Sequence, residues 1–166
     1  MQLYQLTSKQ VFPIPKQKAW DFLSDPKNLA VITPPHMGFH ILSGADRPMF
    51  QGQIIQYIVK PFPLISTKWV TEITHLKDGD YFVDEQRFGP YALWHHKHFI
   101  KEVPEGVEME DIIDYKLPFG ILGRLVHPIM VKKQLQKIFE FREAKLIELF
   151  GKVNHHQNFL EIKPIK

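Results

Sequence analysis

Residues 128–150 have the periodicity of one long amphipathic helix, and this helix limits what the rest of the chain can form. Pro128 is well suited to the first turn of a helix, and Gly151 is a typical C-terminal stop. The apolar positions recur at helical spacing on one wide face: Val131, Leu135, Ile138, Phe139, Leu146, Leu149 and Phe150. Because the opposite face carries charged and amide side chains, the helix needs a partner surface that buries its apolar face.

The residues before this helix read mostly as strands separated by short turns. Two short helices are expected after the first strand, one starting at Pro15 and one at Pro26. Asp25 can cap the second helix. A short helical turn over residues 119–126 is expected before a break at His127-Pro128. Short Gly and Pro turns between consecutive strands are typical of an antiparallel meander. The strands are expected at residues 3–12, 39–42, 53–59, 67–76, 81–88, 92–103 and 107–117.

Together these elements predict an α+β protein with a helix-grip fold. We expect a curved, seven-stranded antiparallel sheet with two short helices after its first strand and the long C-terminal helix over its concave face. The 166 residues suit one domain, which we place at residues 1–151, followed by a polar tail at 152–166 without an element of its own. A sheet curled over a helix leaves a hollow wherever facing side chains fail to meet, so an internal cavity is expected.

Composition excludes several classes of function. The chain has no cysteine, which excludes disulfides, thiolate nucleophiles and zinc–thiolate sites. Its net charge of +3 comes from basic residues spread along the chain, so no nucleic-acid partner is expected. The sequence shows no signal-peptide pattern and no apolar stretch of membrane-spanning length, so we expect a cytoplasmic protein. An aromatic share of 13% suits either a dense core or the wall of an apolar pocket.

Polar and aromatic residues alternate on two neighbouring strands. Trp94, His96 and His98 share one face of their strand, and Asp111 and Tyr115 share one face of the next. A four-residue turn between the strands pairs Trp94 with Tyr115 and His98 with Asp111. We therefore expect His96, His98 and Asp111 to point into the hollow, and Trp94 and Tyr115 on the same faces are further candidate ligand contacts. The other face then pairs opposite charges: His95 with Asp114 and Lys101 with Glu108.

The helix and the remaining strands add further candidates. Arg142 interrupts the apolar stripe of the long helix, so its guanidinium must reach the rim, a carboxylate of the wall or an anionic ligand group. Trp69 and Phe139 are candidate wall residues that also suit a core. Asp84 and Glu85 cannot both face inward, because neighbouring strand residues alternate between the two faces, and the sequence leaves the choice open.

Several segments match a known pattern at the joints between elements. They are Phe12-x-x-Pro15 leading to Ala19-Trp20-Asp21-Phe22-Leu23-Ser24-Asp25-Pro26 with Leu29 and Ile32-Thr33-Pro34, Asp84-Glu85-Gln86 through Gly89-Pro90 to Trp94-x-His96-x-His98-Phe99, Asp111-x-Ile113-x-Tyr115-x-Leu117-Pro118, and Ile138-Phe139-x-Phe141-Arg142. In these segments the chain resembles the START-like superfamily, SRPBCC, and within it the bacterial ligand-binding and polyketide cyclase-like proteins. The resemblance covers residues 2–150 and implies a helix-grip fold. Most members of this branch have no assigned activity.

Three functions remain open. The first is the binding of a small hydrophobic or aromatic metabolite in the internal cavity, without a cofactor. The second is an enzyme of the aromatase, cyclase or dehydratase kind, in which a His or an Asp moves a proton. The third is a cupin-like metal enzyme, because His96-x-His98 on a strand is a metal-ligand geometry. A second cupin motif with a third His is missing from the sequence, so no metal is expected.

Overall fold

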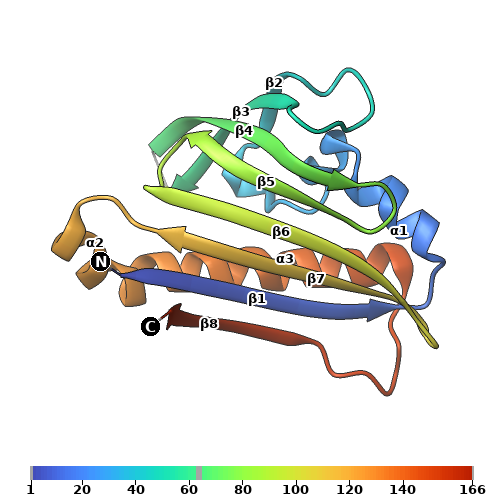
Figure 1. Ribbon diagram of the computed structural model, residues 1–166. Coiled ribbons are helices and arrows are strands. Elements are labelled where there is room, and N and C mark those ends of the chain that lie inside the picture. Colours follow the sequence, from blue (N-terminus) through green and yellow to red (C-terminus); the bar gives the residue numbers. More distant parts are fainter. Residues whose placement is uncertain (1, 63–64, 166) are drawn as a thin grey trace.

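The long C-terminal helix lies along one face of an antiparallel sheet, as the sequence predicts (Figure 1). The computed structural model describes residues 2–62 and 65–165. The helix, α3, runs from Lys132 to Phe150 and ends at Gly151, whose backbone N–H bonds to the carbonyl of Ile147. The predicted α+β class and helix-grip fold are confirmed. The helix residues buried beneath the sheet are Leu135, Phe139, Arg142, Leu146 and Phe150.

All the described strands belong to one sheet of eight, in the order β2-β3-β4-β5-β6-β7-β1-β8. Every neighbouring pair is antiparallel, and β2 to β7 follow one another as the predicted meander. A cupin-like enzyme would need a double-sheet jelly roll, and the described residues form none. The strands are β1 (Leu3–Phe12), β2 (His40–Ser43), β3 (Ile54–Phe62), β4 (Ile65–Lys77), β5 (Tyr81–Phe88), β6 (Leu93–Val103), β7 (Gly106–Lys116) and β8 (Phe159–Ile165).

Three short helices connect β1 to β2. They are α1 (Lys16–Leu23) and two 3-10 helices, η1 (Pro26–Ala30) and η2 (Pro35–Met37). Asp25 caps η1, because its carboxylate accepts a hydrogen bond from the backbone N–H of Lys27 at 3.0 Å. The second predicted helix is therefore a single 3-10 element, and η2 follows it.

Two helical elements precede α3 and run into it. α2 (Gly120–Val126) continues through a π-helical turn, η3 (His127–Val131), into α3. The predicted break at His127-Pro128 is therefore wrong, because the wider π turn accommodates a proline that lacks a backbone N–H. None of the described helices is both long enough and apolar enough to cross a lipid bilayer.

Residues 159–165 correct the expectation of a tail without an element. This segment forms β8, which pairs with β1 and places Ile162 opposite Leu6. Both side chains are buried. β8 thereby covers a strand edge that would otherwise present unpaired backbone groups. The sheet has eight strands instead of seven, and its packing extends beyond residue 151.

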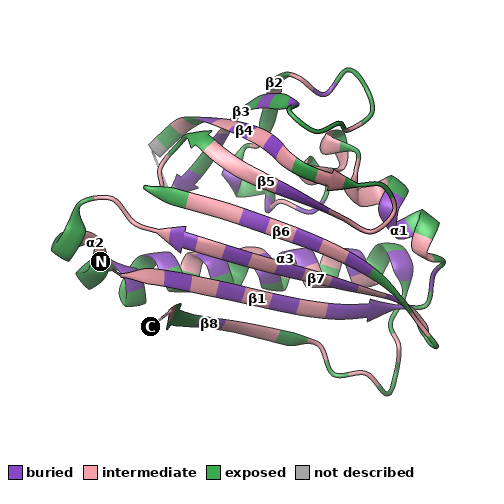
Figure 2. Ribbon diagram, viewed as in Figure 1, coloured by how far each residue is buried: buried purple, intermediate pink, exposed green. Residues whose placement is uncertain are grey.

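The register of β6 on β7 agrees with the prediction, and it sets which side chains face α3. Buried positions alternate with less buried ones along β7 and β1 (Figure 2). The turn between β6 and β7 requires glycine at Gly106, whose φ is +135° and whose added Cβ would lie 2.2 Å from the Phe12 carbonyl oxygen. The four predicted pairs are present: Trp94 with Tyr115, His98 with Asp111, His95 with Asp114 and Lys101 with Glu108. His96 lies opposite Ile113.

Candidate functional site

An internal cavity of about 200 Å³ lies between the sheet, the segment after β1 and α3. Its wall is mostly apolar, with large aromatic surfaces from Trp69 on β4, Trp94 on β6 and Phe139 on α3. Trp69 and Trp94 pack edge to face with their ring centroids 5.4 Å apart. An engineered protein cavity of roughly 150 Å³ holds benzene, so a small aromatic molecule fits this volume. The predicted wall residues Trp69, Trp94 and Phe139 therefore line one space.

Five polar side chains gather at one wall of this cavity. Asp84 comes from β5, His96 and His98 from β6, Asp111 from β7 and Arg142 from α3. The sheet register places Asp84 opposite His96 and His98 opposite Asp111, all on the face toward α3. His96 and His98 line the cavity together with Asp84 and Arg142. Asp111 is buried beside both rings.

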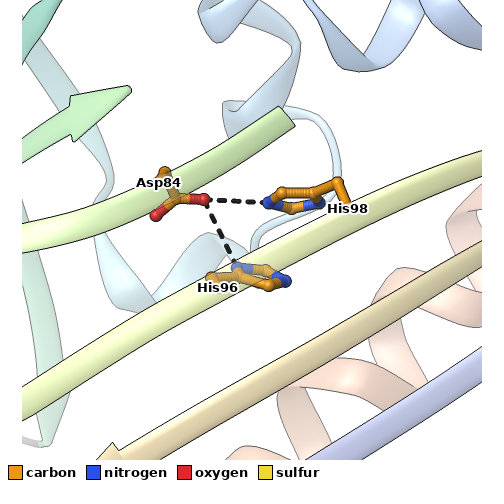
Figure 3. A group of neighbouring side chains, drawn as sticks. All are labelled: Asp84, His96 and His98. Carbon is orange, nitrogen blue, oxygen red and sulfur yellow. Dashed lines mark hydrogen bonds and ion pairs between the residues drawn. The ribbon is translucent and has the colours of Figure 1, made fainter. Parts of the chain in front are cut away.

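The two carboxylates contact both imidazole rings. His98 Nε2 lies 2.8 Å from Asp84 Oδ2, and His96 Nδ1 lies 3.6 Å from the same oxygen (Figure 3). On its other side, His96 Nε2 lies 3.1 Å from Asp111 Oδ1. That oxygen also lies 3.3 Å from Arg142 Nη2. The ring centroids of His96 and His98 are 3.7 Å apart, so the cluster is tightly packed.

Burial and neighbouring charges set the protonation of the cluster. Burial, with a further contribution from His98, lowers the pKa of His96 to about 4, so His96 is neutral at pH 7. Burial also opposes charge on His98, but its contacts with Asp111 and Asp84 outweigh burial and raise its pKa. Burial opposes charge on Asp111 too, yet the Arg142 guanidinium holds the pKa of that carboxyl well below its usual range. Positive charge on Arg142 therefore stabilises a buried carboxylate.

Three buried nitrogen atoms of the cavity wall lack a hydrogen-bond partner among the described residues: Trp69 Nε1, His98 Nδ1 and Arg142 Nε. His98 Nδ1 lies 2.8 Å from Asp111 Oδ1, but without the alignment of a hydrogen bond. The indole and guanidinium nitrogens can only donate. A buried donor without an acceptor costs about 1–3 kcal/mol, so Trp69 Nε1 and Arg142 Nε favour a guest that supplies an oxygen.

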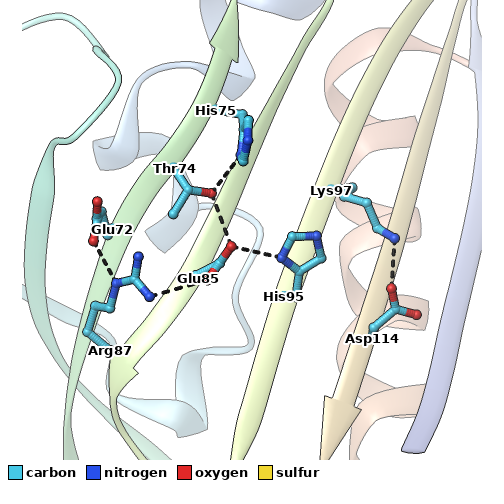
Figure 4. Close-up of polar contacts among 8 residues, drawn as sticks. All are labelled: Glu72, Thr74, His75, Glu85, Arg87, His95, Lys97 and Asp114. Atoms are coloured by element: carbon cyan, nitrogen blue, oxygen red, sulfur yellow. Dashed lines mark hydrogen bonds and ion pairs between the residues drawn. The ribbon is translucent and has the colours of Figure 1, made fainter.

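The structure decides between Asp84 and Glu85. Asp84 faces the cavity, and Glu85 faces outward, where its Oε1 lies 3.0 Å from His95 Nδ1 (Figure 4). Arg87 joins this outer network through Glu85, with 3.3 Å between Nη1 and Oε2, and its Nε also donates to Glu72 at 2.6 Å. β5 and β6 therefore carry an acid–histidine arrangement on each face. The outer one is part-exposed, and exposed pairs of this kind contribute only about 0–1 kcal/mol.

Tyr115 lies outside the cavity wall, although it shares a strand face with Asp111. Its hydroxyl oxygen lies 2.7 Å from His127 Nε2, and its ring packs in the part of the core around Leu135. Its predicted role in ligand contact therefore loses support. Sequence reasoning missed Tyr57 as a wall residue, although it alternates with Ile55 and Val59 on β3. Its hydroxyl oxygen lies 3.1 Å from the Thr71 hydroxyl.

Comparison with known proteins identifies similar folds only. No protein-family model matches the chain, and no curated protein matches it. Protein CV1439 from Chromobacterium violaceum is similar in structure, with a TM-score of 0.67 and 13% identity over 90% of this chain and 99% of that one. TTHA0849 from Thermus thermophilus has a TM-score of 0.63 and 15% identity over 87% and 94% of the two chains. Ara h 8.0201 has a TM-score of 0.56 and 12% identity over 88% and 99%.

These similarities extend over nearly the whole of each chain, which supports the helix-grip fold. Identities of 12–15% carry no information about a shared ligand or reaction. The features of this chain that bear on function are therefore the cavity and its polar cluster.

Proposed function

We propose that this protein binds a small apolar or aromatic metabolite with an oxygen-bearing end inside the cavity. The observation that carries the proposal is the combination of an apolar cavity of about 200 Å³ with unpartnered donors on its wall. Aromatic walls at Trp69, Trp94 and Phe139 exclude water and favour an apolar body. Arg142 Nε favours an oxygen acceptor at one end.

The resemblance to START-like, SRPBCC proteins supports the same function. The segments that carry it include Trp94, His96 and His98 on β6 and Arg142 on α3, which lie at the cavity. Membership of this superfamily, and of its ligand-binding branch, is part of the proposal. The helix-grip fold is compatible with it.

The test uses a matched pair of aromatic probes, 2-naphthoate and naphthalene, monitored by tryptophan fluorescence. The carboxylate probe should bind at least about tenfold more tightly, because a hydrogen bond to a charged group contributes about 1.5–3 kcal/mol. Arg142→Lys keeps a positive charge beside Asp111 but removes Nε, so it should lose this preference. Arg87→Lys on the outer face of β5 is the matched control. Binding of neither probe, or an unchanged preference in Arg142→Lys, contradicts the proposal.

A second candidate function is acid–base catalysis of the cyclase or dehydratase kind. One observation favours it: neutral His96 contacts Asp111 at 3.1 Å, which orients the ring as a proton acceptor. Mass spectrometry of the molecule that co-purifies with the protein separates the two functions. Release of an unchanged molecule favours binding. Conversion that stops in His96→Gln, while the molecule still binds, favours catalysis.

A further inference from the structure

Asp84, His96 and His98 present three metal-binding atoms to one point in the cavity wall. One ligand atom of each side chain lies within 4.8 Å of the other two. A tetrahedral ion about 2.0–2.2 Å from nitrogen and oxygen ligands holds those atoms about 3.4 Å apart. The distances from Asp84 Oδ2 to His98 Nε2, 2.8 Å, and to His96 Nδ1, 3.6 Å, lie on either side of that value. We propose that this trio binds a divalent transition-metal ion such as Zn²⁺.

Asp111 and Arg142 form a supporting layer behind the trio. His96 Nε2 lies 3.1 Å from Asp111 Oδ1, so a proton on Nε2 leaves the lone pair of Nδ1 toward Asp84. A carboxylate behind a ligating histidine fixes its tautomer and ring orientation, which is the usual arrangement at protein metal sites. Arg142 Nη2 holds the same carboxylate at 3.3 Å. The three ligands therefore stand on rigid, adjacent strands with their orientation already set.

Two imidazoles and one carboxylate form the donor set of zinc and non-haem iron sites with open coordination positions. His96, His98 and Asp84 all line the cavity, so those positions face the space available to a guest. This inference deepens the proposed function, since an oxygen of the apolar guest would complete the coordination. The metal trio itself needs no guest, and it can be tested without one.

The test is titration of chelator-treated, metal-free protein with Co²⁺, monitored by visible absorption, and with Zn²⁺ by calorimetry. We expect one ion per chain. His98→Gln and Asp84→Asn should each weaken binding at least about 100-fold, and Asp111→Asn about 10–100-fold. His95→Gln is the matched control, because His95 contacts Glu85 on the outer face of the same two strands. Equal affinity in His98→Gln and His95→Gln overturns the proposal.

A measurement on the unmodified protein guards against variants that fail to fold. Histidine-ring ¹⁵N spectra should show shifts of His96 and His98 on addition of Zn²⁺, with His95 unchanged. Shifts confined to His155 and His156 in the segment before β8 would assign the ion to another place and overturn the trio. Since no organic guest is present, this result is independent of probe binding. Zinc binding without naphthoate binding contradicts only the proposed function. Naphthoate binding without zinc binding contradicts only the metal site.

α2 and η3 form a surface outside the set of residues that line the cavity. Six large apolar side chains there, which we call the α2 surface, are each at least 50% exposed: Phe119, Ile121, Leu122, Leu125, Ile129 and Met130. α2 forms an exposed projection at the end of the molecule where β1 begins (Figure 2). Contiguous apolar patches of this kind mark interaction sites.

The charged residues of the segment that carries the α2 surface all have one sign. Residues 115–139 contain no Asp or Glu, and their five basic residues are Lys116, Arg124, Lys132, Lys133 and Lys137. Apolar side chains beside Lys and Arg are the pattern of segments that insert into an anionic lipid interface. We infer that the α2 surface docks on membranes with anionic headgroups.

Sedimentation with lipid vesicles tests this docking. The protein should bind vesicles that contain phosphatidylcholine and phosphatidylglycerol. Its affinity for vesicles of pure phosphatidylcholine should be at least about tenfold lower. The double variant Ile121→Asp, Leu125→Asp should lose binding. Phe88→Asp is the control, because Phe88 is 71% exposed on β5. Failure to bind anionic vesicles overturns the inference. So does a concentration-dependent dimer that the double variant abolishes, since the surface would then belong to a second copy of the chain.

Discussion

Arg142 of α3 and Asp111 of β7 form an ion pair across the buried space between helix and sheet, with 3.3 Å between Nη2 and Oδ1. The guanidinium also lies over Phe139, 5.6 Å from the ring centroid. This pairing meets the requirement that an arginine in an apolar stripe should reach a carboxylate. One side chain thus holds the helix to the sheet and lines the cavity, while its buried Nε has no hydrogen-bond partner among the described residues.

Removal of the Arg142 guanidinium, with Asp111 left in place, should destabilise the fold strongly. Arg142→Met leaves the carboxylate of Asp111 buried without its guanidinium, a change that costs about 3–5 kcal/mol in the free energy of unfolding. Urea denaturation measures this loss. Addition of Asp111→Asn in the same chain should recover part of it, because the uncompensated charge is removed. An Arg142→Met protein as stable as the unmodified one would show that the pair contributes little.

His127 should make the fold less stable in weak acid. Its ring stacks on Tyr4 with centroids 3.5 Å apart, and burial together with Lys132 lowers its pKa to about 4 from 6.5. Below pH 6.5 the unfolded chain takes up a proton that the folded chain does not bind. The contribution of His127 to the free energy of unfolding therefore has its full value above pH 6.5. It falls by about 1–3 kcal/mol as the pH drops toward 4.

His127→Phe provides the comparison, because phenylalanine can stack on Tyr4 but does not titrate. Urea unfolding at pH 7 and pH 4.5 should show a smaller decline for this variant than for the unmodified protein. Parallel declines would mean that His127 is not the group responsible.

Gly106→Ala should cost more than the substitution of another left-handed glycine. Its added Cβ would lie 2.2 Å from the Phe12 carbonyl oxygen, whereas a Cβ on Gly52, with φ of +88°, meets nothing within 4 Å. Gly52→Ala should cost about 1–2 kcal/mol from backbone strain alone. We expect Gly106→Ala to lose about 3 kcal/mol or more in thermal unfolding. Similar losses at both sites would mean that the β6–β7 turn shifts away from β1.

Two leucines on α3 should differ sharply in their contribution to stability. Leu146 is 1% exposed and Leu149 is 41% exposed, although both belong to the apolar stripe in the sequence. Leu146→Ala should cost about 2–5 kcal/mol, since it empties a packed position. Leu149→Ala should change the free energy of unfolding by about 0.5 kcal/mol or less. Equal losses would contradict the observed orientation of the helix.

The order of strands and helices could be predicted because period-2 and period-3.6 patterns are local. The β6–β7 register was also accessible, since only one pairing brings His98 opposite Asp111 and Lys101 opposite Glu108. β8 was missed because its pairing with β1 joins residues near opposite ends of the chain. No local pattern within residues 159–165 predicts which strand edge they cover.

The candidate site could be predicted only in part. His96, His98, Asp111 and Arg142 each stand out as polar residues at apolar positions. Asp84 could not be separated from Glu85, because the irregular connection between β5 and β6 sets which of them faces inward. Tyr115 shares a strand face with Asp111 but is not among the residues that line the cavity, because the face of a strand does not fix which part of α3 or η3 lies opposite it.

The position of β1 has a consequence for the time at which the sheet can assemble. The first strand lies between β7 and β8, so its partners are residues 107–115 on one side and 159–165 on the other. During synthesis, β1 must wait for its neighbours until most of the chain has emerged. Pairing of strands across such a sequence separation is slow. The edges of the strands already synthesised therefore stay exposed for most of the translation of the chain.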